Sequence, residues 1–516
     1  MTKVCAEELD SSSEASASIT IVTSVKPEQE VSSVFSTALE SGLKPTALKR
    51  KVIALELKQA IDLALANNYQ LQFSSLEPEL AKQALDLARA VHEPEFFASY
   101  SQSQGRTQAA IVDLPKGSEQ EVAATGLRGQ SSLGTRWNLG VDATAFDASV
   151  PSAQGSGYFT SVEVVQPLLK GAGRAAANSD VRLAKNGEKI SRLQLEQALM
   201  HIVVDVVFAY VDVYAAEQSL VIAKQNRDLA KQTLDEERER HRLGRAASSD
   251  LYRPDATYAL RQDAVIRAEQ NLRFRENRLK ALISNEQQDL LTYSIDVGQL
   301  PRFKHQMFDA ASDFEQALKM RPDFRIAELQ KNNSQVELDR DKRNRLPQLD
   351  LVLRYQGSGL SGDADFSSAY DNYRANGQDG HYLGVNFSVP ITNKRGRSQT
   401  KLSEIKLSQS RIELKRFEQQ ILLDLDTSAF QVENERLRVE AAKRSVLLAE
   451  QTLKAEEEKM AVGRSTSFYV LDLQSRLAAA QSQHLSAEAS YLKSVAEYFR
   501  QNGSILKTYG IEVASL

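Results

Sequence analysis

One motif in the sequence has the spacing of a phosphate-binding loop. Gly171-Ala172-Gly173-Arg174-Ala175-Ala176 fits the pattern G-x-G-x-x-A, follows a strand-like stretch and opens a helix. In a dinucleotide-binding fold, such a loop needs a second parallel strand and an acidic residue about 20 residues further on. Here a helical pattern continues instead for about 65 residues, and Gly396-Arg397 repeats the arrangement later in the chain. The motif therefore predicts a corner between a strand and a helix.

Other residues capable of chemistry are isolated or are flanked by opposite charges. The six histidines lack a second His or Cys at metal-ligand spacing, and the only cysteine is Cys5. The carboxylates Glu456, Glu457 and Glu458 lie between Lys454 and Lys459, as on a solvated helix face. We therefore predict no catalytic residue, no metal site, no cofactor and no enzymatic activity. The histidines are His92, His201, His241, His305, His381 and His484.

The charge of the chain is balanced and dispersed. The net charge is −4, and Lys and Arg are scattered along 516 residues rather than gathered in blocks. A basic footprint for nucleic acid is absent, so no nucleic-acid partner is predicted. The apolar runs near 202–207 are too short for a membrane-spanning helix, which needs about 20 apolar residues. If the chain crosses a membrane, it must do so with strands.

The sequence predicts two copies of one structural unit. Ala230-Lys231-Gln232-Thr233-Leu234 recurs as Ala449-Glu450-Gln451-Thr452-Leu453, and Gly244-Arg245 recurs as Gly463-Arg464 at the same offset. A shared offset across separate motifs indicates duplication. We place the first repeat at 51–286, a linker at 287–313, the second repeat at 314–505 and a C-terminal tail at 506–516.

Each repeat should contain a shorter helix, a strand pair and a long helical hairpin. The segments 175–242 and 397–461 are rich in Ala, Leu, Glu, Gln, Lys and Arg, which favour helices. Return helices are expected over 250–285 and 469–501, so that Gly244 and Gly463 mark the hairpin tips. The shorter helices are expected over 57–91 and 314–345.

Alternating apolar residues predict membrane strands. Leu349, Leu351 and Leu353 alternate with polar residues after Pro347, and similar patterns occur over 96–104, 158–166 and 382–389. These lengths suit tilted membrane strands. Four strands per chain cannot close a barrel and open edges are not tolerated in lipid, so several subunits should pool their strands. The connections 105–157 and 357–380 are long, and 131–145 alternates again as in an additional hairpin.

The N-terminal segment 1–50 is rich in Ser, Glu, Thr and Ala and lacks the apolar core of a secretion signal. We expect it to be a low-complexity, disordered segment. Cys5 is either a free thiol or the lipid-anchored first residue of a mature chain.

The strand-ending Gln166-Pro167-Leu168-Leu169 with Gly173-Arg174, the duplicated halves and the tip 244–250 resemble the TolC-like outer-membrane efflux family over about 50–505. The resemblance implies a mixed fold: a trimeric 12-stranded outer-membrane β-barrel, four strands per chain, continued by a long α-helical coiled-coil barrel across the periplasm. It also implies passive export of small molecules or proteins in a tripartite efflux or type I secretion system. The implied partners are outer-membrane lipid, a periplasmic adaptor protein and an inner-membrane transporter.

The resemblance further implies a periplasmic gate at the hairpin tips. Related channels carry acids six and nine positions after the second tip glycine, which correspond to Tyr469 and Asp472; Tyr469 departs from that pattern. In the first tip, Asp250 either contacts the gate or starts the returning helix, since Ser248, Ser249 and Asp250 are all capping residues. Asp472 is equally compatible with an ordinary solvated helix face. The candidate gate residues are Gly244, Arg245, Asp250, Gly463, Arg464, Tyr469 and Asp472.

Two other classes of protein share some of these features. A soluble coiled-coil scaffold would account for the long helices but not for the alternating strands. A periplasmic adaptor would need one helical hairpin, whereas this sequence predicts two.

Overall fold

The computed structural model describes residues 51–105, 118–148, 154–244, 247–285, 293–298 and 309–511. The chain divides into a unit of Met1–Lys51, of which only Lys51 is described, and a unit of Val52–Leu516, which holds the elements below. The predicted N-terminal segment, Cys5 and Arg245 lie outside the described residues.

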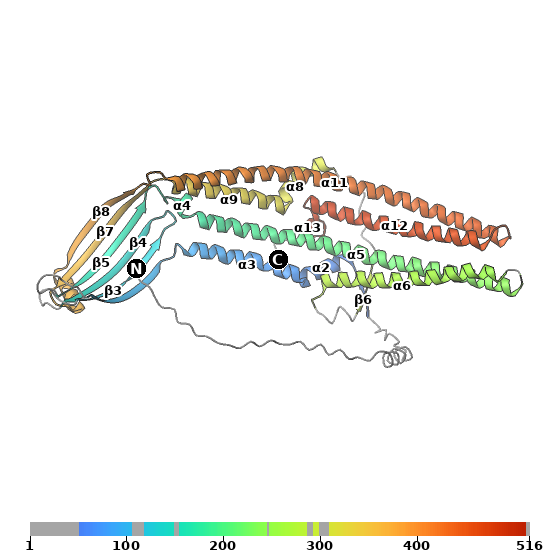
Figure 1. Ribbon diagram of the computed structural model, residues 1–516, viewed down its shortest axis with the longest axis horizontal. Helices are drawn as coiled ribbons and strands as arrows, with labels where there is room; N and C mark the ends of the chain where they lie inside the picture. Colours follow the sequence, from blue (N-terminus) through green and yellow to red (C-terminus); the bar gives the residue numbers. More distant parts are fainter. Residues whose placement is uncertain are drawn as a thin grey trace, which may run out of the picture. The chain divides into compact units, whose positions relative to one another are not determined.

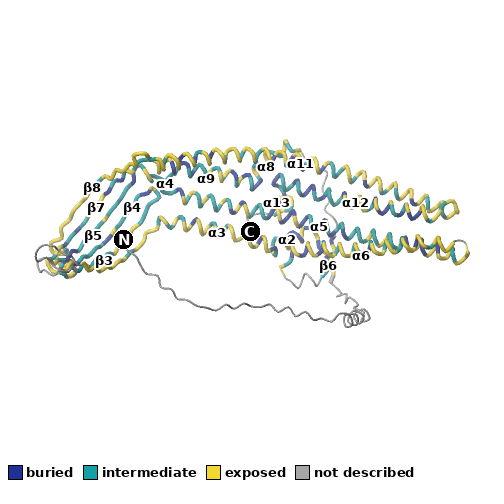
Figure 2. Tube along the Cα trace, viewed as in Figure 1, coloured by how far each residue is buried: buried dark blue, intermediate teal, exposed yellow. Residues whose placement is uncertain are grey.

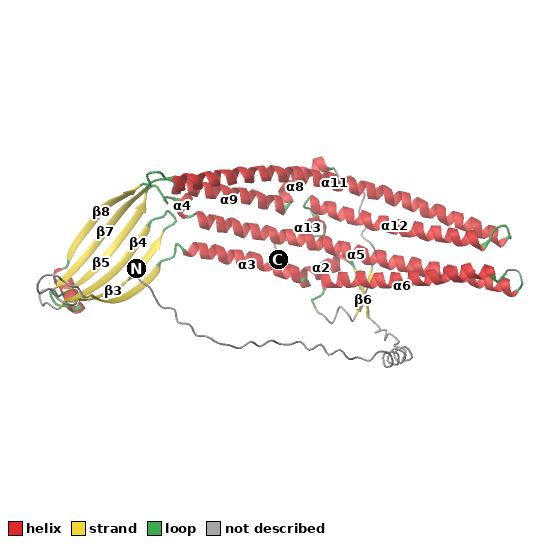
Figure 3. Ribbon diagram, in the orientation of Figure 1, coloured by secondary structure: helices red, strands yellow, loops and turns green. Residues whose placement is uncertain are grey.

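Six strands form one antiparallel sheet in the order β2-β3-β4-β5-β7-β8 (Figures 1 and 3). Each strand is 11–14 residues long. That length suffices for a tilted strand to cross a bilayer. The strands are β2 (Glu95–Gly105), β3 (Ser118–Gln130), β4 (Arg136–Ala148), β5 (Gly155–Pro167), β7 (Gln348–Ser361) and β8 (Gln378–Ser388).

The prediction of four strands per chain is wrong. The four predicted strands are present as β2, β5, β7 and β8, but β3 and β4 form a complete further hairpin between β2 and β5. The alternation noted over 131–145 falls on the turn and on β4. Strand β3 escaped notice because its centre, Ala123-Ala124-Thr125-Gly126, has small side chains that give little contrast between its two faces.

The two faces of the sheet differ in chemistry. Residues paired directly across antiparallel strands share a face. The pairings Phe96 with Leu127, Leu127 with Leu139 and Leu353 with Leu383 therefore place large apolar side chains on one face, here named the apolar face. The pairings Glu95 with Arg128 and Glu163 with Arg354 define the opposite, polar face.

Four helices continue from the sheet (Figure 1). Helix α3 (Tyr69–Ala90) leads into β2, α5 (Ser179–Arg242) follows β5 after the short α4 (Arg174–Ala177), α9 (Pro322–Asn344) leads into β7, and α11 (Lys394–Ala461) follows β8. Helix α3 packs on α5, α5 on α9 and α9 on α11, so the helices lie side by side in the order of the strands that they join. The Gly173-Arg174 corner is thus the predicted passage from strand to helix.

Helices α5 and α11 each turn back as a hairpin, as predicted. Helix α6 (Ser249–Ile283) packs along α5, and α12 (Ser467–Gln501) packs along α11. The 64 residues of α5 correspond to about 96 Å of helix at 1.5 Å per residue. Helix α12 also contacts α5, which joins the two hairpins.

Each predicted shorter helix is interrupted once. Asn68 separates α2 (Leu57–Asn67) from α3, and its side chain accepts a hydrogen bond from the backbone N–H of Leu71, 3.1 Å away. Arg321 separates α8 (Ala310–Met320) from α9, which begins with Pro322. Proline fits the first turn of a helix because the N–H it lacks would have no partner there. A short helix, α13 (Ile505–Thr508), follows α12.

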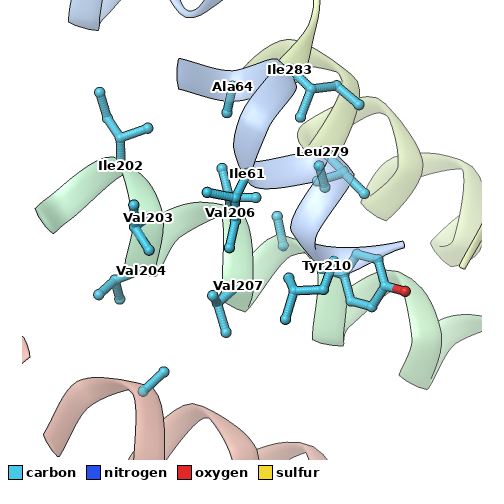
Figure 4. Close-up of a cluster of buried hydrophobic side chains, with 14 of the residues drawn as sticks. Ile61, Ala64, Ile202, Val203, Val204, Val206, Val207, Tyr210, Leu279 and Ile283 are labelled. Atoms are coloured by element: carbon cyan, nitrogen blue, oxygen red, sulfur yellow. The ribbon is translucent and has the colours of Figure 1, made fainter. Parts of the chain in front are cut away.

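The main apolar core lies where α2, α5 and α6 meet (Figure 4). Val203, Val206, Val207 and Tyr210 of α5 are fully buried, and the Tyr210 hydroxyl donates a hydrogen bond to the carbonyl oxygen of Leu55. Figure 2 shows the same burial as dark stretches of α5. The apolar runs near 202–207 were expected to be too short for a membrane-spanning helix, but α5 contains an 18-residue window that is apolar enough to cross a membrane by length and composition. Because 61% of that window is buried, core packing accounts for it.

A small two-stranded sheet of β1 (Lys51–Leu55) and β6 (Tyr293–Val297) lies against α5 and was not predicted. Half-buried Glu217 of α5 accepts a hydrogen bond from the Val297 backbone N–H at 3.2 Å. Burial raises the pKa of Glu217 to about 7, and the negative charges of Asp296 and Glu276 act in the same direction.

We expect Glu217 to make stability depend on pH. Its folded pKa of about 7 exceeds the ordinary value of 4.5, so its contribution is greatest below pH 4.5, falls as the pH rises towards 7 and is constant above. Glu217→Gln should flatten this part of the profile of unfolding temperature between pH 5 and pH 8. An unchanged profile in the variant would assign the dependence to another group.

Helix α10 (Phe366–Asn376) packs on the ends of β5 and β7 remote from the long helices. Its Tyr373 lies against Gly357 and Gly359, where an added Cβ would come within 3.0 Å of that side chain or its backbone. Tyr158 of β5 contacts the rings of Tyr370 and Tyr373. The glycines therefore leave the room that α10 occupies on the sheet.

Candidate functional site

The second hairpin tip is closed by a glycine in the left-handed conformation. Gly463 has φ +76°, its N–H donates to the carbonyl oxygen of Met460, and the N–H of Arg464 donates to that of Lys459. This pair of bonds is the Schellman arrangement that ends many helices. Gly244, with φ +71° and an N–H bonded to the His241 carbonyl, has the corresponding place in the first tip. Both glycines lie at the predicted tips.

A side-chain cluster braces the second tip. The Ser465 hydroxyl donates to Glu456 Oε1 at 2.6 Å, and Lys459 Nζ lies 2.9 Å from Glu456 Oε2. The hydrogen bond from Ser465, followed by the bond and charge of Lys459, lowers the pKa of Glu456. The loop is thereby tied to the last turns of α11.

Asp250 has a local role at the start of α6. Its carboxylate accepts hydrogen bonds from the Ala247 backbone N–H at 3.0 Å and from the Ser249 hydroxyl at 3.3 Å. This geometry favours the helix-start interpretation over a gate contact. Ser248 occupies the N-cap position but makes no capping hydrogen bond with its side chain.

Tyr469 and Asp472 lie on the exposed first turns of α12. The Tyr469 ring meets the Phe468 ring edge to face, with centroids 5.2 Å apart. Asp472 forms an ion pair with Arg476 of the same helix, 2.9 Å away, and both side chains are largely exposed. Both residues make their contacts within α12, and their part in a gate stays a prediction.

Two contacts that the sequence did not reveal join the hairpins near their tips. The guanidinium of Arg253 on α6 lies 4.2 Å from the ring centroid of Phe468 on α12. Further along the same pair of helices, Arg261 Nη2 donates to the Ser475 hydroxyl at 2.6 Å. The sequence signal that could have indicated these contacts is spacing, because residues seven or eight apart lie on the same face of a helix. This spacing separates Arg253 from Arg261 on α6, and Phe468 from Ser475 on α12.

A transverse row of polar side chains crosses the polar face of the sheet. Glu95 pairs with Arg128 in a two-bond contact of 2.8 and 2.9 Å, and Arg354 pairs with Glu163. A groove of about 760 Å³ next to this row is lined from the sheet and from the end of α3. In register order from β2 to β8 the row is Glu95, Arg128, Asn138, Glu163, Arg354 and Tyr382.

Among the described residues, no group of three or more His, Cys, Asp or Glu side chains is placed to hold a metal ion. The carboxylates of Glu95 and Glu163 in the sheet and of Glu456 and Asp472 at the second tip each form an ion pair with a basic side chain, as structural charges do.

A sheet with an apolar and a charged face, continued by long helical hairpins, is the architecture of outer-membrane channels that extend into the periplasm. Residues 314–498 match the family model described as outer membrane efflux protein. This match confirms the predicted resemblance to the outer-membrane efflux family, a family of channels and not of enzymes. The proteins related by this match are outer-membrane channels that reach into the periplasm, which supports the same location and an efflux-channel role for this chain.

Solved structures of outer-membrane proteins share the fold over most of their length. The CmeC outer membrane channel of Campylobacter jejuni matches with a TM-score of 0.67 at 17% identity, over 89% of this chain and 88% of that one. VceC of Vibrio cholerae matches with 0.64 at 13% identity, over 87% and 96%. The open MtrE channel of Neisseria gonorrhoeae matches with 0.60 at 15% identity, over 87% and 89%. Comparison with curated proteins gave no match.

Proposed function

We propose that the chain is one subunit of a homotrimeric channel that passively exports small molecules or proteins in a tripartite efflux or type I secretion system. The single observation that carries this proposal is the sheet, whose apolar face suits lipid and whose charged face suits a water-filled lumen. Transmembrane barrels have this division, with apolar side chains outward and polar side chains inward. A soluble scaffold or a periplasmic adaptor, the two other classes considered, would not need such a sheet.

The lateral sides of the chain support assembly with further copies. Strands β2 and β8 are the edges of the sheet, and an open edge in lipid leaves backbone groups without hydrogen bonds. Helix α3, next to β2, exposes an apolar stripe, and so does α11, next to β8. The α3 stripe is Tyr69, Phe73, Leu76, Leu80 and Leu87; exposed apolar residues of α11 include Ile405, Ile412, Leu423, Phe430 and Leu437.

Both sides can be covered at once by copies of the same chain. The β8–α11 side of one subunit would meet the β2–α3 side of the next, and repetition around an axis closes a ring. The apolar stripe on α3 has the spacing of a coiled-coil seam, with steps of three, four and seven residues between its members. The number three follows from the resemblance to the efflux family.

The periplasmic end would bind the other components of the system. The tips at Gly244 and Gly463 lie at the ends of the hairpins opposite to the strands (Figure 1). We propose that a periplasmic adaptor protein contacts these hairpins and connects the channel to an inner-membrane transporter, which supplies the energy and selects the cargo.

The proposed gate lies at the same tips. Contacts between the α5–α6 and α11–α12 hairpins, including Arg253 with Phe468, would hold them together when the channel is closed. Arg464, Tyr469 and Asp472 are placed on the same turns for contacts with neighbouring subunits, and Arg245 is proposed with them from the sequence.

Removing the contact between hairpins should open the channel more often. A cation over an exposed aromatic ring is worth about 0.5–1 kcal/mol, so three copies of Phe468→Ala should shift the equilibrium towards the open state roughly tenfold or more. The measurement is open probability and conductance in planar bilayers. Arg267→Gln, which breaks an ion pair with Asp263 within α6, is the matched control. If the unchanged protein, Phe468→Ala and Arg267→Gln all had the same open probability, Phe468 would not be part of the gate.

The proposed function is tested by mass and conductance. Extraction in mild detergent should give a complex of three 57.3 kDa chains that conducts ions in planar bilayers. A monomer that dissolves without detergent and does not conduct would contradict the proposal.

A further inference from the structure

The β3–β4 hairpin is a full part of the sheet rather than a loop decoration. Strand β3 pairs with β2 along the whole of β2, from Glu95 opposite Arg128 to Gly105 opposite Ser118. Strand β4 pairs with β5 from Arg136 opposite Val165 to Phe146 opposite Gly155. Both added strands therefore extend over the same height as the strands on either side.

Towards the helical end of the sheet, the added strands also alternate in phase with their neighbours. Leu127 of β3 and Leu139 and Val141 of β4 lie on the apolar face, while Arg128 and Asp142 lie on the polar face. Leu127 and Leu139 are 40% and 48% exposed in the isolated chain. Lipid on the apolar face would cover these exposed leucine side chains and keep them out of water.

The row from Glu95 to Tyr382 crosses β3 and β4 without a break. Arg128 of β3 pairs with Glu95 of β2, and Asn138 of β4 stands between Arg128 and Glu163 in the register. If the β3–β4 hairpin folded away from the sheet, the row would be interrupted between Glu95 on β2 and Glu163 on β5. The polar side chains instead continue from one edge of the sheet to the other.

We propose that this channel has an eighteen-stranded barrel, built from three six-stranded sheets whose β8 edge pairs with the β2 edge of the next copy. The proposal rests on the trimer proposed above. The second copy is the occupant of each edge, because an edge at membrane depth can be satisfied only by another strand.

The width of such a barrel fits the helices below it. With strands 4.7–4.9 Å apart and tilted by 35–45°, eighteen strands have a backbone radius of about 17–20 Å, and twelve have about 11–13 Å. Four helices per chain, α3, α5, α9 and α11, join the sheet. Twelve such helices, 8–10 Å apart, form a ring with a radius of about 15–19 Å. The wider barrel therefore meets the helical tunnel without a constriction, and cargo that passes the tunnel also passes the barrel.

Cysteine labelling in membranes tests the position of the hairpin. In a Cys5→Ser background, single cysteines replace Leu139 and Asp142 on the two faces of β4, and Leu353 and Gln356 provide the same comparison on β7. A hydrophilic maleimide reacts with the thiolate in water. Asp142→Cys and Gln356→Cys should therefore react at least about tenfold faster than Leu139→Cys and Leu353→Cys.

The outcomes separate the two proposals. Equal labelling of the β4 pair, with the β7 difference retained, would overturn the eighteen-stranded barrel and leave the channel. Equal labelling of both pairs would overturn the proposed function as well.

Direct imaging counts the strands. Electron cryomicroscopy of the full chain should show eighteen strands around one axis. Deletion of 118–148 keeps β2 and β5 antiparallel neighbours, so this variant should give twelve strands. Twelve strands in the full chain, whether from three copies or from a complex of two, would contradict the proposal.

Discussion

Val385→Arg is expected to destabilise the assembled channel in a bilayer by about 2 kcal/mol or more, whereas Asn386→Arg should have little effect. Val385 is 61% exposed on the apolar face and lies two residues from the middle of β8. An arginine facing lipid costs about 2–4 kcal/mol at the bilayer midplane. Asn386 faces the lumen opposite Asp350, so that an arginine there gains a carboxylate neighbour.

The pair is measured as resistance of the trimer to denaturant in lipid vesicles. Adjacent residues of one strand share backbone, depth and subunit edge, so only the direction of the side chain differs between the two variants. Equal losses would show that the apolar face does not contact lipid, and equal tolerance would place β8 outside the membrane.

Leu80→Asp on α3 is expected to dissociate the trimer. Leu80 is 62% exposed in the isolated chain and belongs to the apolar stripe of α3. Burying a leucine contributes about 1.5–3 kcal/mol, and a ring of three subunits contains the contact three times. An unpaired carboxylate in a buried seam adds a further cost. Analytical ultracentrifugation in detergent should therefore show mainly monomers at concentrations at which the unchanged protein is trimeric.

Lys82→Asp provides the control for this variant. Residue 82 lies two positions further along α3, on the opposite side of the helix. It introduces the same carboxylate without touching the stripe and should leave the trimer intact. Trimers of unchanged stability in Leu80→Asp would mean that another surface joins the subunits.

The sequence was most informative where its contrasts are large. Leu349, Leu351 and Leu353 alternate so strongly with polar residues that β7 was predicted from them, and β3 was missed because alanine, threonine and glycine blur the pattern. The interruptions at Asn68 and Arg321 were missed because a single residue outside a helix hardly alters a 3.6-residue period. Strands β1 and β6, with five residues each, are too short and too distant in sequence to be paired by pattern.

The candidate gate was predicted only at the level of the chain turn. Gly244 and Gly463 were found because a residue with positive φ at the end of a helix is usually glycine. Arg253 and Phe468 were not found, since their contact depends on how two helices from distant parts of the sequence are rotated towards each other. The role of Asp250 at the start of α6 was one of the two alternatives left open by the sequence.

The two edges of the six-stranded sheet constrain how the protein is made. A single chain presents the backbone of β2 and β8 and two apolar helix stripes to its surroundings, so a newly exported subunit can neither enter the bilayer alone nor remain long in water without aggregating. Insertion must therefore coincide with or follow association of the subunits. The amount of channel formed should then rise with the third power of the subunit concentration. Low expression should leave protease-sensitive subunits in the periplasm rather than small pores in the outer membrane.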